Sequence, residues 1–471
     1  MILSSDGNRL LIVSAHFPPD RSAGTHRVLR LANYLQSHGW ETSVLTIDPS
    51  SYRHPIQQDE SLVERIDPRV TIVRTGAWRG HTAMVRWRNR LLRRGGQAQA
   101  GTGARDTRTR DPRSQDPRRQ EKSGWRAWRR AGTTHLFGFP DDEIGWFGYA
   151  VVRGLQVIRQ RKIDVVLSSA PPFTCHLIGH ALRSLANVRW VADFRDPWAR
   201  APWGKGGSAR GHQWLESRVI GRADAVALNT PELHREFSDW YGPDLSARFH
   251  VVTNGYDADV VEPYARAVPG AALPLVITHA GTLYQARDPR PLLEALARCR
   301  REGAVPENGI HLNLVGKVAS AFDVDTVIER LGLSGCVTRQ PPVPHHESLR
   351  LLAASHVLVV IQPDTGLQVP VKLYEYVGLR RPILALAEDG AVARLVRDGN
   401  FGVVVSPADV EGIARALADL YRRHITQSPA EVDDERAAQF DARHQSAILA
   451  EILSGLVART TPGLVTRSVR P

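Results

Sequence analysis

The chain has few cysteines and no long apolar run. Its three cysteines, Cys175, Cys299 and Cys336, are widely spaced, and none belongs to a CxxC pair. This spacing argues against a zinc site or a disulfide framework and favours a reducing compartment. No apolar run approaches the roughly 20 residues of a membrane-spanning helix, and Leu10–Ala15 lacks the length and the basic lead of a secretory signal. We therefore expect a soluble, cytoplasmic protein.

Positive charge is in excess in only one segment. Residues 79–130 contain 16 Lys or Arg and 4 Asp or Glu, so this segment accounts for the whole net charge of +12. Its centre is rich in Gly, Arg, Asp and Pro without an apolar period, which predicts a mobile insertion. Its flanks mix Trp and Leu with Arg and could either lie on an anionic membrane or pack on the folded domain. Because the rest of the chain is balanced, nucleic acid is not an expected partner.

Short apolar strands alternate with amphipathic helices along most of the chain. The first strand, Leu10–Ala15, precedes a helix in which Val28, Leu31 and Leu35 recur at helical spacing, and a second strand follows over 41–48. Repeated strand–helix–strand units predict an α/β fold, with parallel sheets covered by helices on both faces.

The length predicts two domains, because single hydrophobic cores stop growing near ~250–300 residues. The stretch after Tyr256 is typical of a linker, and a second strand–helix series begins at 274. We expect a first domain over 1–257, a linker over 258–273, a second domain over 274–425 and C-terminal helices over 426–471.

Ligands of such sheets bind beyond the carboxyl ends of the strands, and the first candidate there is a small-residue turn. Ser22, Ala23 and Gly24 follow the first strand and precede a helix. Backbone N–H groups at that helix start could hold a phosphate. The turn matches neither a Walker A loop nor GxGxxG, so an ordinary strand–helix turn is the alternative.

The second candidate is the charged end of the strand in WVADFRDPW. Asp193 and Asp196 flank Arg195, and Trp198 follows as a possible stacking surface. Carboxylates there could accept hydrogen bonds from sugar hydroxyls. The alternative is a buried Asp–Arg pair that fixes the turn.

Two further candidates lie in the second half of the chain. Lys372 and Glu375 share one helix face, so that the lysine could meet phosphate and the carboxylate could accept ribose hydroxyls. A surface ion pair between them is the alternative. Gly281 and Thr282 end the first strand of this half, and Arg287 in the following loop could pair with a diphosphate or with the adjacent Asp288.

Metal ligands are not indicated. The DxD matches at 257–259 and 323–325 are as frequent as chance allows in a long chain, and His345-His346 lacks partners at metal spacing. We expect no metal and no other cofactor.

Four stretches together resemble one family. FPPDRSAGTHRVLRLANYLQSHGWETSVLT, WVADFRDPW, HAGTLYQARDPRPLLEAL and VPVKLYEYVGLRRPILAL are similar, in this order, to the family 4-type glycosyltransferases of the bacterial branch with a DFRDPW segment. The resemblance implies a GT-B fold, with two Rossmann-like, doubly wound domains facing a cleft and C-terminal helices crossing back to the first domain. It also implies a nucleotide-diphosphate sugar on the second domain, an acceptor on the first, retaining transfer and no bound metal.

The resemblance assigns roles to the candidates. Arg287 and Lys372 would stabilise the leaving diphosphate, Glu375 would hold the ribose, and Asp193 or Asp196 would contact the transferred sugar or the acceptor. The implied donor-binding set is Ser22, Ala23, Gly24, Gly281, Thr282, Arg287, Lys372, Leu373 and Glu375, and the implied catalytic set is Asp193, Asp196, Arg287 and Lys372.

The chain also departs from the family pattern. Leu367 stands eight residues before Glu375, where the family has an acid, while Thr282 and Asp288 stand where it has Arg and Lys. Arg287 is a candidate substitute for one of the two missing cations. No residue therefore takes the first acid's usual contact with the donor sugar.

The expected activity is sugar transfer from a nucleotide-diphosphate sugar to a glycan, a lipid-linked sugar or a small metabolite. An epimerase or hydrolase of the same shape is one alternative, and a non-catalytic basic protein that binds membranes or nucleic acid is another. The basic segment 79–130 suggests a peripheral position on the inner face of the membrane.

Overall fold

The computed structural model describes residues 8–52, 56–78, 139–200, 209–266, 269–270, 274–284, 286–363, 366–428 and 432–458. The basic segment 79–130, and with it the expected membrane contact, lies outside these residues. Two compact units divide the chain: residues 1–28 with 41–190, and residues 29–40 with 191–471.

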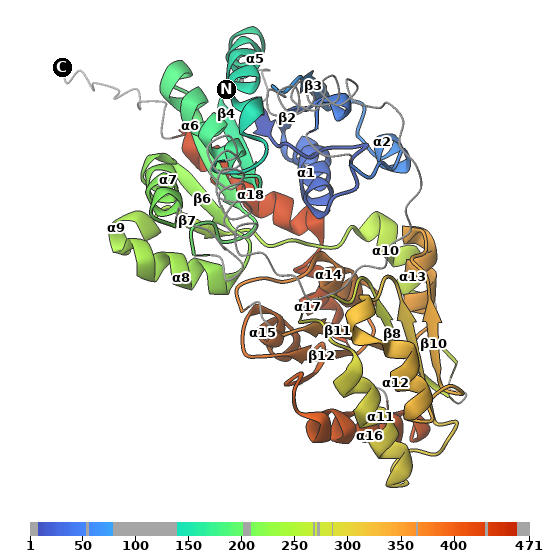
Figure 1. Ribbon diagram of the computed structural model, residues 1–471. Helices are drawn as coiled ribbons and strands as arrows, with labels where there is room; N and C mark the ends of the chain where they lie inside the picture. The colour runs from blue at the N-terminus through green and yellow to red at the C-terminus, as the bar shows by residue number, and fades with distance from the viewer. Residues whose placement is uncertain are drawn as a thin grey trace, which may run out of the picture. The chain divides into compact units, whose positions relative to one another are not determined.

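Two parallel sheets organise the described chain (Figure 1). Within it, seven strands follow the order β3-β2-β1-β4-β5-β6-β7 and six follow the order β10-β9-β8-β11-β12-β13. The strands are β1 (Asn8–Val13), β2 (Trp40–Ile47), β3 (Thr71–Thr75), β4 (Val165–Ala170), β5 (Arg189–Phe194), β6 (Ala225–Leu228), β7 (Phe249–Val251), β8 (Leu275–Ala280), β9 (Ile310–Val315), β10 (Val337–Gln340), β11 (Val357–Gln362), β12 (Ile383–Ala387) and β13 (Gly402–Val405). Both orders begin 3-2-1-4, the Rossmann arrangement, so the predicted doubly wound α/β fold is confirmed.

Helices connect the strands. The α-helices are α1 (Ala23–Tyr34), α2 (Ser61–Glu64), α5 (Phe147–Arg161), α6 (Thr174–Ala186), α7 (Ala209–Arg222), α8 (Pro231–Tyr241), α9 (Pro243–Ser246), α10 (Ala258–Ala265), α11 (Arg290–Arg301), α12 (Val324–Arg330), α13 (His345–Ala353), α14 (Val371–Gly378), α15 (Ala391–Asp398), α16 (Val410–Ile425), α17 (Asp434–Ala438) and α18 (Ala442–Ala458). Short 3-10 turns are η1 (Leu35–His38), η2 (Pro49–Ser51), η3 (Ile144–Trp146) and η4 (Ser320–Phe322).

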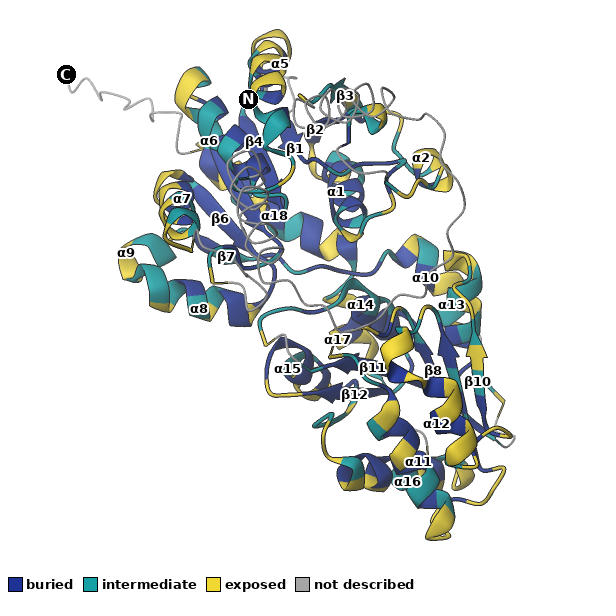
Figure 2. Cartoon of the chain, viewed as in Figure 1, coloured by how far each residue is buried: buried dark blue, intermediate teal, exposed yellow. Residues whose placement is uncertain are grey.

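The first strand of the first unit is an apolar run after its first two residues. Leu10 to Val13 of β1 are completely buried, and β1 pairs in parallel with β4 through Leu10 and Val165. Such continuous runs are typical of parallel strands, because helices cover both faces of the sheet. Figure 2 shows the same contrast, with buried strands and helices exposed on their outer sides.

The second sheet separates two apolar clusters. Alternate residues of β11 enter different clusters, with Val359 among side chains of α11 and α16 and Val360 among those of α14 and α15. This alternation follows from the two-residue period of a strand. The central strands β11 and β12 are therefore buried on both faces.

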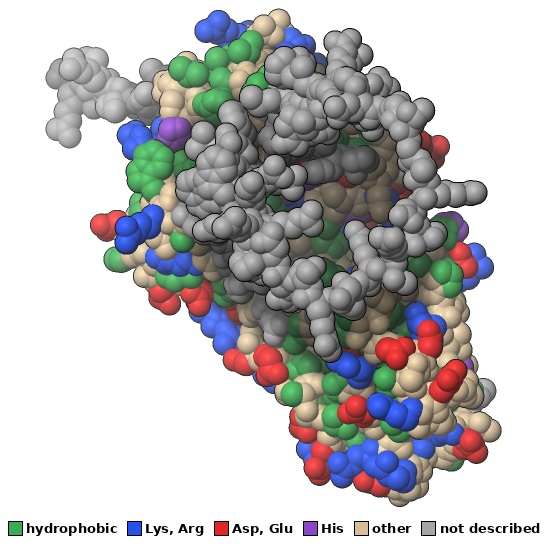
Figure 3. Space-filling view, in the orientation of Figure 1, with side chains coloured by type: hydrophobic (Ala, Val, Ile, Leu, Met, Phe, Trp, Pro, Cys, Tyr) green, Lys and Arg blue, Asp and Glu red, His purple; other side chains and the backbone are tan. Residues whose placement is uncertain are grey.

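Three details of the second unit refine the sequence expectations. The tail contains two helices after α16, as predicted, and the expected linker contains helix α10. Asp259, in the first of the two DxD matches, lies in the first turn of α10. Acidic and basic side chains intermix over the region of α11 and α16 (Figure 3), as in the pair Arg298–Glu302.

In the described part of the chain, no helix is both long and apolar enough to cross a bilayer.

Candidate functional site

The second sheet changes winding direction between β8 and β11. These strands pair in parallel, β9 continues on the far side of β8, and β12 continues on the far side of β11. Ligands of doubly wound sheets bind beyond the strand ends at this point. Gly281 directly follows β8, and α14 follows β11, so the structure brings two of the predicted stretches to one place.

Lys372 reaches from α14 to the end of β8. Its Nζ lies 3.3 Å from the carbonyl oxygen of Ala280 and 3.4 Å from Nε2 of His279. A Cβ placed on Gly281 would lie 2.9 Å from the same Nζ, so a side chain there would displace the ammonium. Lys372 therefore does not form the surface pair with Glu375 that its spacing allowed.

Gly281 and Gly316 have backbone conformations that favour glycine. Gly281 has φ +141° and Gly316, after β9, has φ +130°, a region that side chains disfavour. A Cβ on Gly316 would lie 2.2 Å from the carbonyl oxygen of Gly281. Two adjacent strands thus end in glycines whose backbones pack closely, and a side chain on Gly316 would not fit. Sequence reasoning missed Gly316, although its place directly after an apolar strand was the available signal.

His279 and Tyr376 complete the cluster and were also missed. His279 is fully buried in β8, and its Nδ1 lies 3.0 Å from the carbonyl oxygen of Val359 in β11. The Tyr376 hydroxyl accepts a hydrogen bond from the N–H of Ala280 at 3.1 Å. Burial raises the pKa of Tyr376, so the phenol stays protonated.

Positive charge is weakened in this cluster by burial. Burial, and then the neighbouring Arg287, lower the pKa of Lys372 to about 7. Burial, and then Lys372, lower the pKa of His279 well below its usual value, which keeps the imidazole neutral. Such perturbed groups at a strand end are typical of binding sites for charged ligands.

Arg287 lies in the loop after β8, as expected. Its guanidinium carbon is 5.1 Å from the ring centroid of Tyr284. Asp288 pairs with Arg290 at 2.6 Å, which rejects the alternative that it neutralises Arg287. Thr282 is exposed between Gly281 and this loop.

Glu375 and Leu373 lie on different sides of α14. The Oε1 of Glu375 is 2.9 Å from Nε2 of His345, at the start of α13. Leu373 is completely buried in the core, and its N–H donates to the carbonyl oxygen of Pro370 at 2.9 Å. The side chain of Leu373 therefore supports the helix, while Glu375 is partly exposed.

The charged end of β5 is largely buried. Asp193 is 1% exposed, and Asp196 is contacted by the side-chain amide of Gln368. Burial raises the pKa of Asp196, while Arg195 and Gln368 oppose that shift. Trp198 is buried and its Nε1 donates to His212 at 2.9 Å, so the expected stacking surface is used within the protein.

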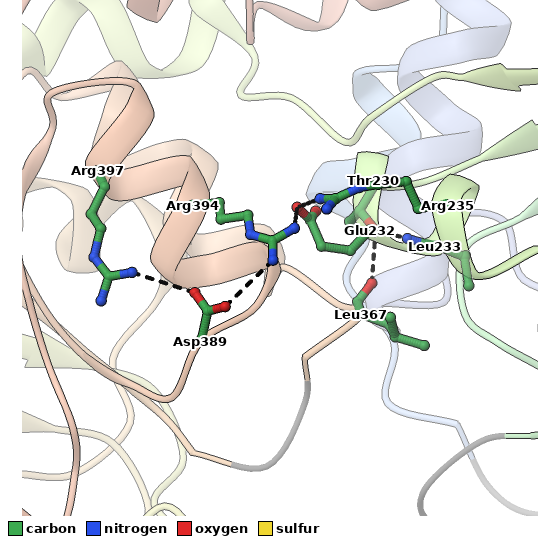
Figure 4. A network of polar contacts seen from close by, with 8 residues as sticks. All are labelled: Thr230, Glu232, Leu233, Arg235, Leu367, Asp389, Arg394 and Arg397. Carbon is green, nitrogen blue, oxygen red and sulfur yellow. Dashed lines mark hydrogen bonds and ion pairs between the residues drawn. The ribbon is translucent and has the colours of Figure 1, made fainter. Parts of the chain in front are cut away.

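Leu367, at the position of the missing family acid, has a main-chain role. The Thr230 hydroxyl donates to its carbonyl oxygen at 2.8 Å and accepts from the N–H of Leu233 at 3.1 Å (Figure 4). In the same network Arg394 contacts Glu232 at 3.4 Å and Asp389 at 3.4 Å. The contact between Thr230 and Leu367 does not depend on the side chain at 367.

The turn of Ser22, Ala23 and Gly24 lies in the first unit and is organised around Asp20. Asp20 is 2% exposed, accepts from Ser22 N at 3.0 Å and Ser22 Oγ at 2.8 Å, and lies 2.6 Å from Nδ1 of His16. Burial would raise the pKa of Asp20, but the contacts with His16 and Ser22 hold it below its usual value. The N–H of Ser22 is thus committed to a carboxylate, while Ala23 and Gly24 begin α1.

Two family models match the chain. Residues 274–423 match the model described as glycosyl transferases group 1. Residues 107–260 match the model described as glycosyltransferase family 4. The first match contains the cluster of Gly281, Lys372 and Glu375, and the second contains Asp193 and Asp196.

Curated relatives carry one shared name, D-inositol 3-phosphate glycosyltransferase. That of Paenarthrobacter aurescens is 27% identical over 213 residues, which is 44% of this chain and 51% of the relative. That of Mycobacterium tuberculosis is 29% identical over 217 residues, which is 44% of this chain and 43% of the relative. The chain thus spans about half the length of the curated relatives it matches.

Solved structures share the fold over nearly the whole chain. Sucrose-phosphate synthase from Thermosynechococcus elongatus covers 96% of this chain and 100% of its own, with a TM-score of 0.62 and 16% identity. HepE from Anabaena, in complex with UDP, covers 95% of this chain and 100% of its own, with a TM-score of 0.61 and 14% identity. The predicted GT-B architecture is confirmed by these likenesses.

Proposed function

The chain belongs to the family 4-type glycosyltransferases with the GT-B fold, and on this premise we propose that it moves a sugar from a nucleotide-diphosphate sugar to an acceptor hydroxyl. In this reaction the bond from the anomeric carbon to the diphosphate breaks and a bond to the acceptor oxygen forms. The acceptor's proton leaves with the diphosphate or passes to solvent. We further propose that transfer retains the anomeric configuration and needs no metal ion.

The observation that carries the proposal is the cluster at the switch point of the second sheet. The ammonium of Lys372 lies against Gly281, and Gly281 in turn lies against Gly316, beyond the ends of β8 and β9 where we propose that the diphosphate binds. Arg287 supplies a second cation from the adjacent loop. Cations aimed at a departing diphosphate stabilise the charge that develops as the bond breaks. This is the task that a metal performs in other enzymes, so these residues support the metal-independent mechanism.

Glu375 is the proposed ribose ligand, and Asp193 and Asp196 are the proposed contacts to the transferred sugar or the acceptor. The raised pKa of Asp196 favours a carboxyl that can also donate a hydrogen bond. Ser22, Ala23 and Gly24 remain proposed neighbours of the diphosphate, with Ala23 and Gly24 as the residues whose N–H groups begin a helix.

Donor and acceptor classes follow from the relatives. A structural neighbour binds UDP, and curated relatives are named for transfer to an inositol phosphate. We therefore propose UDP-sugars as the first donors to test and phosphorylated cyclitols as the first soluble acceptors. Lipid-linked acceptors and a peripheral position at the inner membrane face remain further proposals.

The test is a donor panel in EDTA with the wild type and Glu375→Ala. UDP-, GDP-, dTDP- and ADP-sugars are incubated with and without acceptor, and nucleotide release and product are measured by mass spectrometry. The proposal expects release that depends on acceptor, without metal, and is lost in the variant. Equal turnover without acceptor would favour the epimerase or hydrolase. Absence of binding and turnover for every donor would favour the non-catalytic protein, which salt-sensitive retention on anionic vesicles or DNA would support.

A further inference from the structure

The ammonium of Lys372 contacts a carbonyl oxygen and an imidazole nitrogen. Ala280 contributes a carbonyl oxygen and His279 an imidazole nitrogen, and Arg287 is the like charge that acts on it from the loop after β8. From α14 itself come the neutral phenol of Tyr376 and the carboxylate of Glu375, which contacts His345. No carboxylate forms an ion pair with Lys372 anywhere in the described ranges.

The tautomer of His279 follows from its partner in β11. Its Nδ1 lies 3.0 Å from the carbonyl oxygen of Val359, which can only accept, so Nδ1 carries the proton. Its Nε2 is then a lone-pair acceptor, and it lies 3.4 Å from Nζ of Lys372. Because β8 and β11 are paired strands with buried faces, the position of this acceptor is fixed.

We propose that His279 is a positioning residue that holds Lys372 at the diphosphate site, and that Lys372 takes up one proton from solvent when the diphosphate binds and returns it when the diphosphate leaves. This inference rests on the proposed function, because it concerns the same donor site. It adds a residue that touches neither donor nor acceptor, and it makes donor binding depend on pH.

The proton uptake follows from burial and charge. Burial and Arg287 lower the pKa of Lys372 to about 7, so without a bound diphosphate the neutral amine predominates at pH 8. An anionic diphosphate favours the ammonium and raises the pKa of Lys372 well above 8. Binding at pH 8 therefore draws a proton from the buffer. Since the protonated protein binds more tightly, affinity falls by up to about tenfold per pH unit above pH 7.

The test is calorimetric titration of the full chain with UDP at pH 8 in two buffers of different ionisation enthalpy. The difference between the two measured enthalpies gives the number of protons taken up. The wild type should take up nearly one proton per UDP. Lys372→Arg keeps a permanent charge, so it should bind UDP without that uptake, and it also measures any proton exchanged by UDP itself.

Two substitutions separate positioning from packing. His279→Asn keeps a donor for Val359 but removes the acceptor at Nε2. This variant should bind UDP several-fold more weakly, and its affinity should begin to fall at a lower pH than that of the wild type. His279→Gln, whose amide reaches the place of Nε2, should restore part of both. His356→Asn is the matched control, because His356 is half-buried beside the opposite end of β11 and its Nδ1 accepts from Val276 N–H at 2.9 Å. This control should retain wild-type affinity and proton uptake.

The outcomes are distinguishable from failure of the proposed function. UDP binding by the wild type without proton uptake would overturn the inference and leave the donor site standing. Equal losses of UDP affinity in His279→Asn and His356→Asn would show that His279 has only a structural role. If no nucleotide diphosphate bound at any pH, the donor site itself would be refuted, together with this inference. The wild-type proton count needs no variant, so a variant that fails to fold does not remove the test.

Discussion

The Oε1 atom of Glu375 lies 2.9 Å from Nε2 of His345, so the proposed ribose ligand in α14 is held by the first residue of α13. An ionised carboxylate can accept several hydrogen bonds. The contact with His345 therefore orients Glu375 and still allows it to accept from ribose hydroxyls.

Replacing Glu375 should weaken nucleotide binding more than replacing His345. Glu375→Ala should lower UDP affinity on the order of 10–100-fold, because hydrogen bonds to a charged group contribute about 1.5–3 kcal/mol. His345→Ala should cost only a few-fold, since it removes orientation and not the ligand. Titration calorimetry measures both, with Glu302→Gln as control, because Glu302 is an exposed residue directly after α11. Wild-type affinity in Glu375→Ala would refute the ribose assignment.

Gly281 should tolerate no side chain. Gly281→Ala should destabilise the protein by about 1–3 kcal/mol, because alanine is strained at positive φ. It should also weaken UDP binding, because the added Cβ would lie 2.9 Å from Nζ of Lys372 and displace it. Gly303→Ala is the control for strain alone, because Gly303 has φ +72° with no atom within 4 Å of a built Cβ. Denaturant unfolding and calorimetry separate the two effects. If both variants bind UDP equally well, Lys372 is not held against Gly281.

The fold was predictable from the sequence because several of its strands are continuous apolar runs and its helices are periodic. Runs such as Leu10–Val13 and Val357–Ile361 are buried on both faces, which allows only covered parallel sheets. The expected linker, 258–273, contains helix α10, whose apolar residues Ala258 and Val261 are buried.

The candidate site was only partly predictable. Gly281, Arg287 and Lys372 could be singled out because each follows an apolar strand or begins a helix after one. His279 could not, because it lies inside a strand, and only the pairing of β8 with β11 reveals its contacts with Val359 and Lys372. The burial of Trp198 and its hydrogen bond to His212 were likewise not predicted from the sequence.

The hydroxyl of Thr230 has two partners, so its loss should be felt in stability. Thr230 is the N-cap of α8, accepting from Leu233, and it donates to the carbonyl oxygen of Leu367. Thr230→Val should cost about 1–2 kcal/mol in unfolding free energy, as lost helix caps do. Thr230→Ser keeps the hydroxyl and should lose little.

The same geometry predicts the effect of restoring the family acid. Leu367→Glu should change stability by less than about 1 kcal/mol, because the main-chain carbonyl and not the side chain bonds to Thr230. Turnover of UDP-sugars by this variant, compared with Leu367→Gln, then measures whether a carboxylate at 367 improves contact with the donor sugar. A loss of stability in Leu367→Glu as large as in Thr230→Val would contradict the main-chain assignment.

The stabilising effect of ionised Asp20 on the first unit should be lost at acidic pH. Its pKa is lower in the folded chain than its ordinary value, so its contribution is present above about pH 4 and is lost as pH falls through the folded pKa. Asp20→Asn should therefore show a smaller loss of unfolding free energy between neutral and acidic pH than the wild type.

The contact between His16 and Asp20 gives the matching test. His16→Ala removes the 2.6 Å contact that opposes the effect of burial, so the pKa of Asp20 should rise and acid unfolding should begin at higher pH. At neutral pH the substitution should cost about 1.5–3 kcal/mol, the range for hydrogen bonds to a charged group. His38→Ala, at an exposed position in η1, should leave the acid transition unchanged. Urea unfolding monitored by tryptophan fluorescence at several pH values measures all of these, and an acid transition in His16→Ala at the wild-type pH would show that burial and Ser22 alone set the ionisation of Asp20.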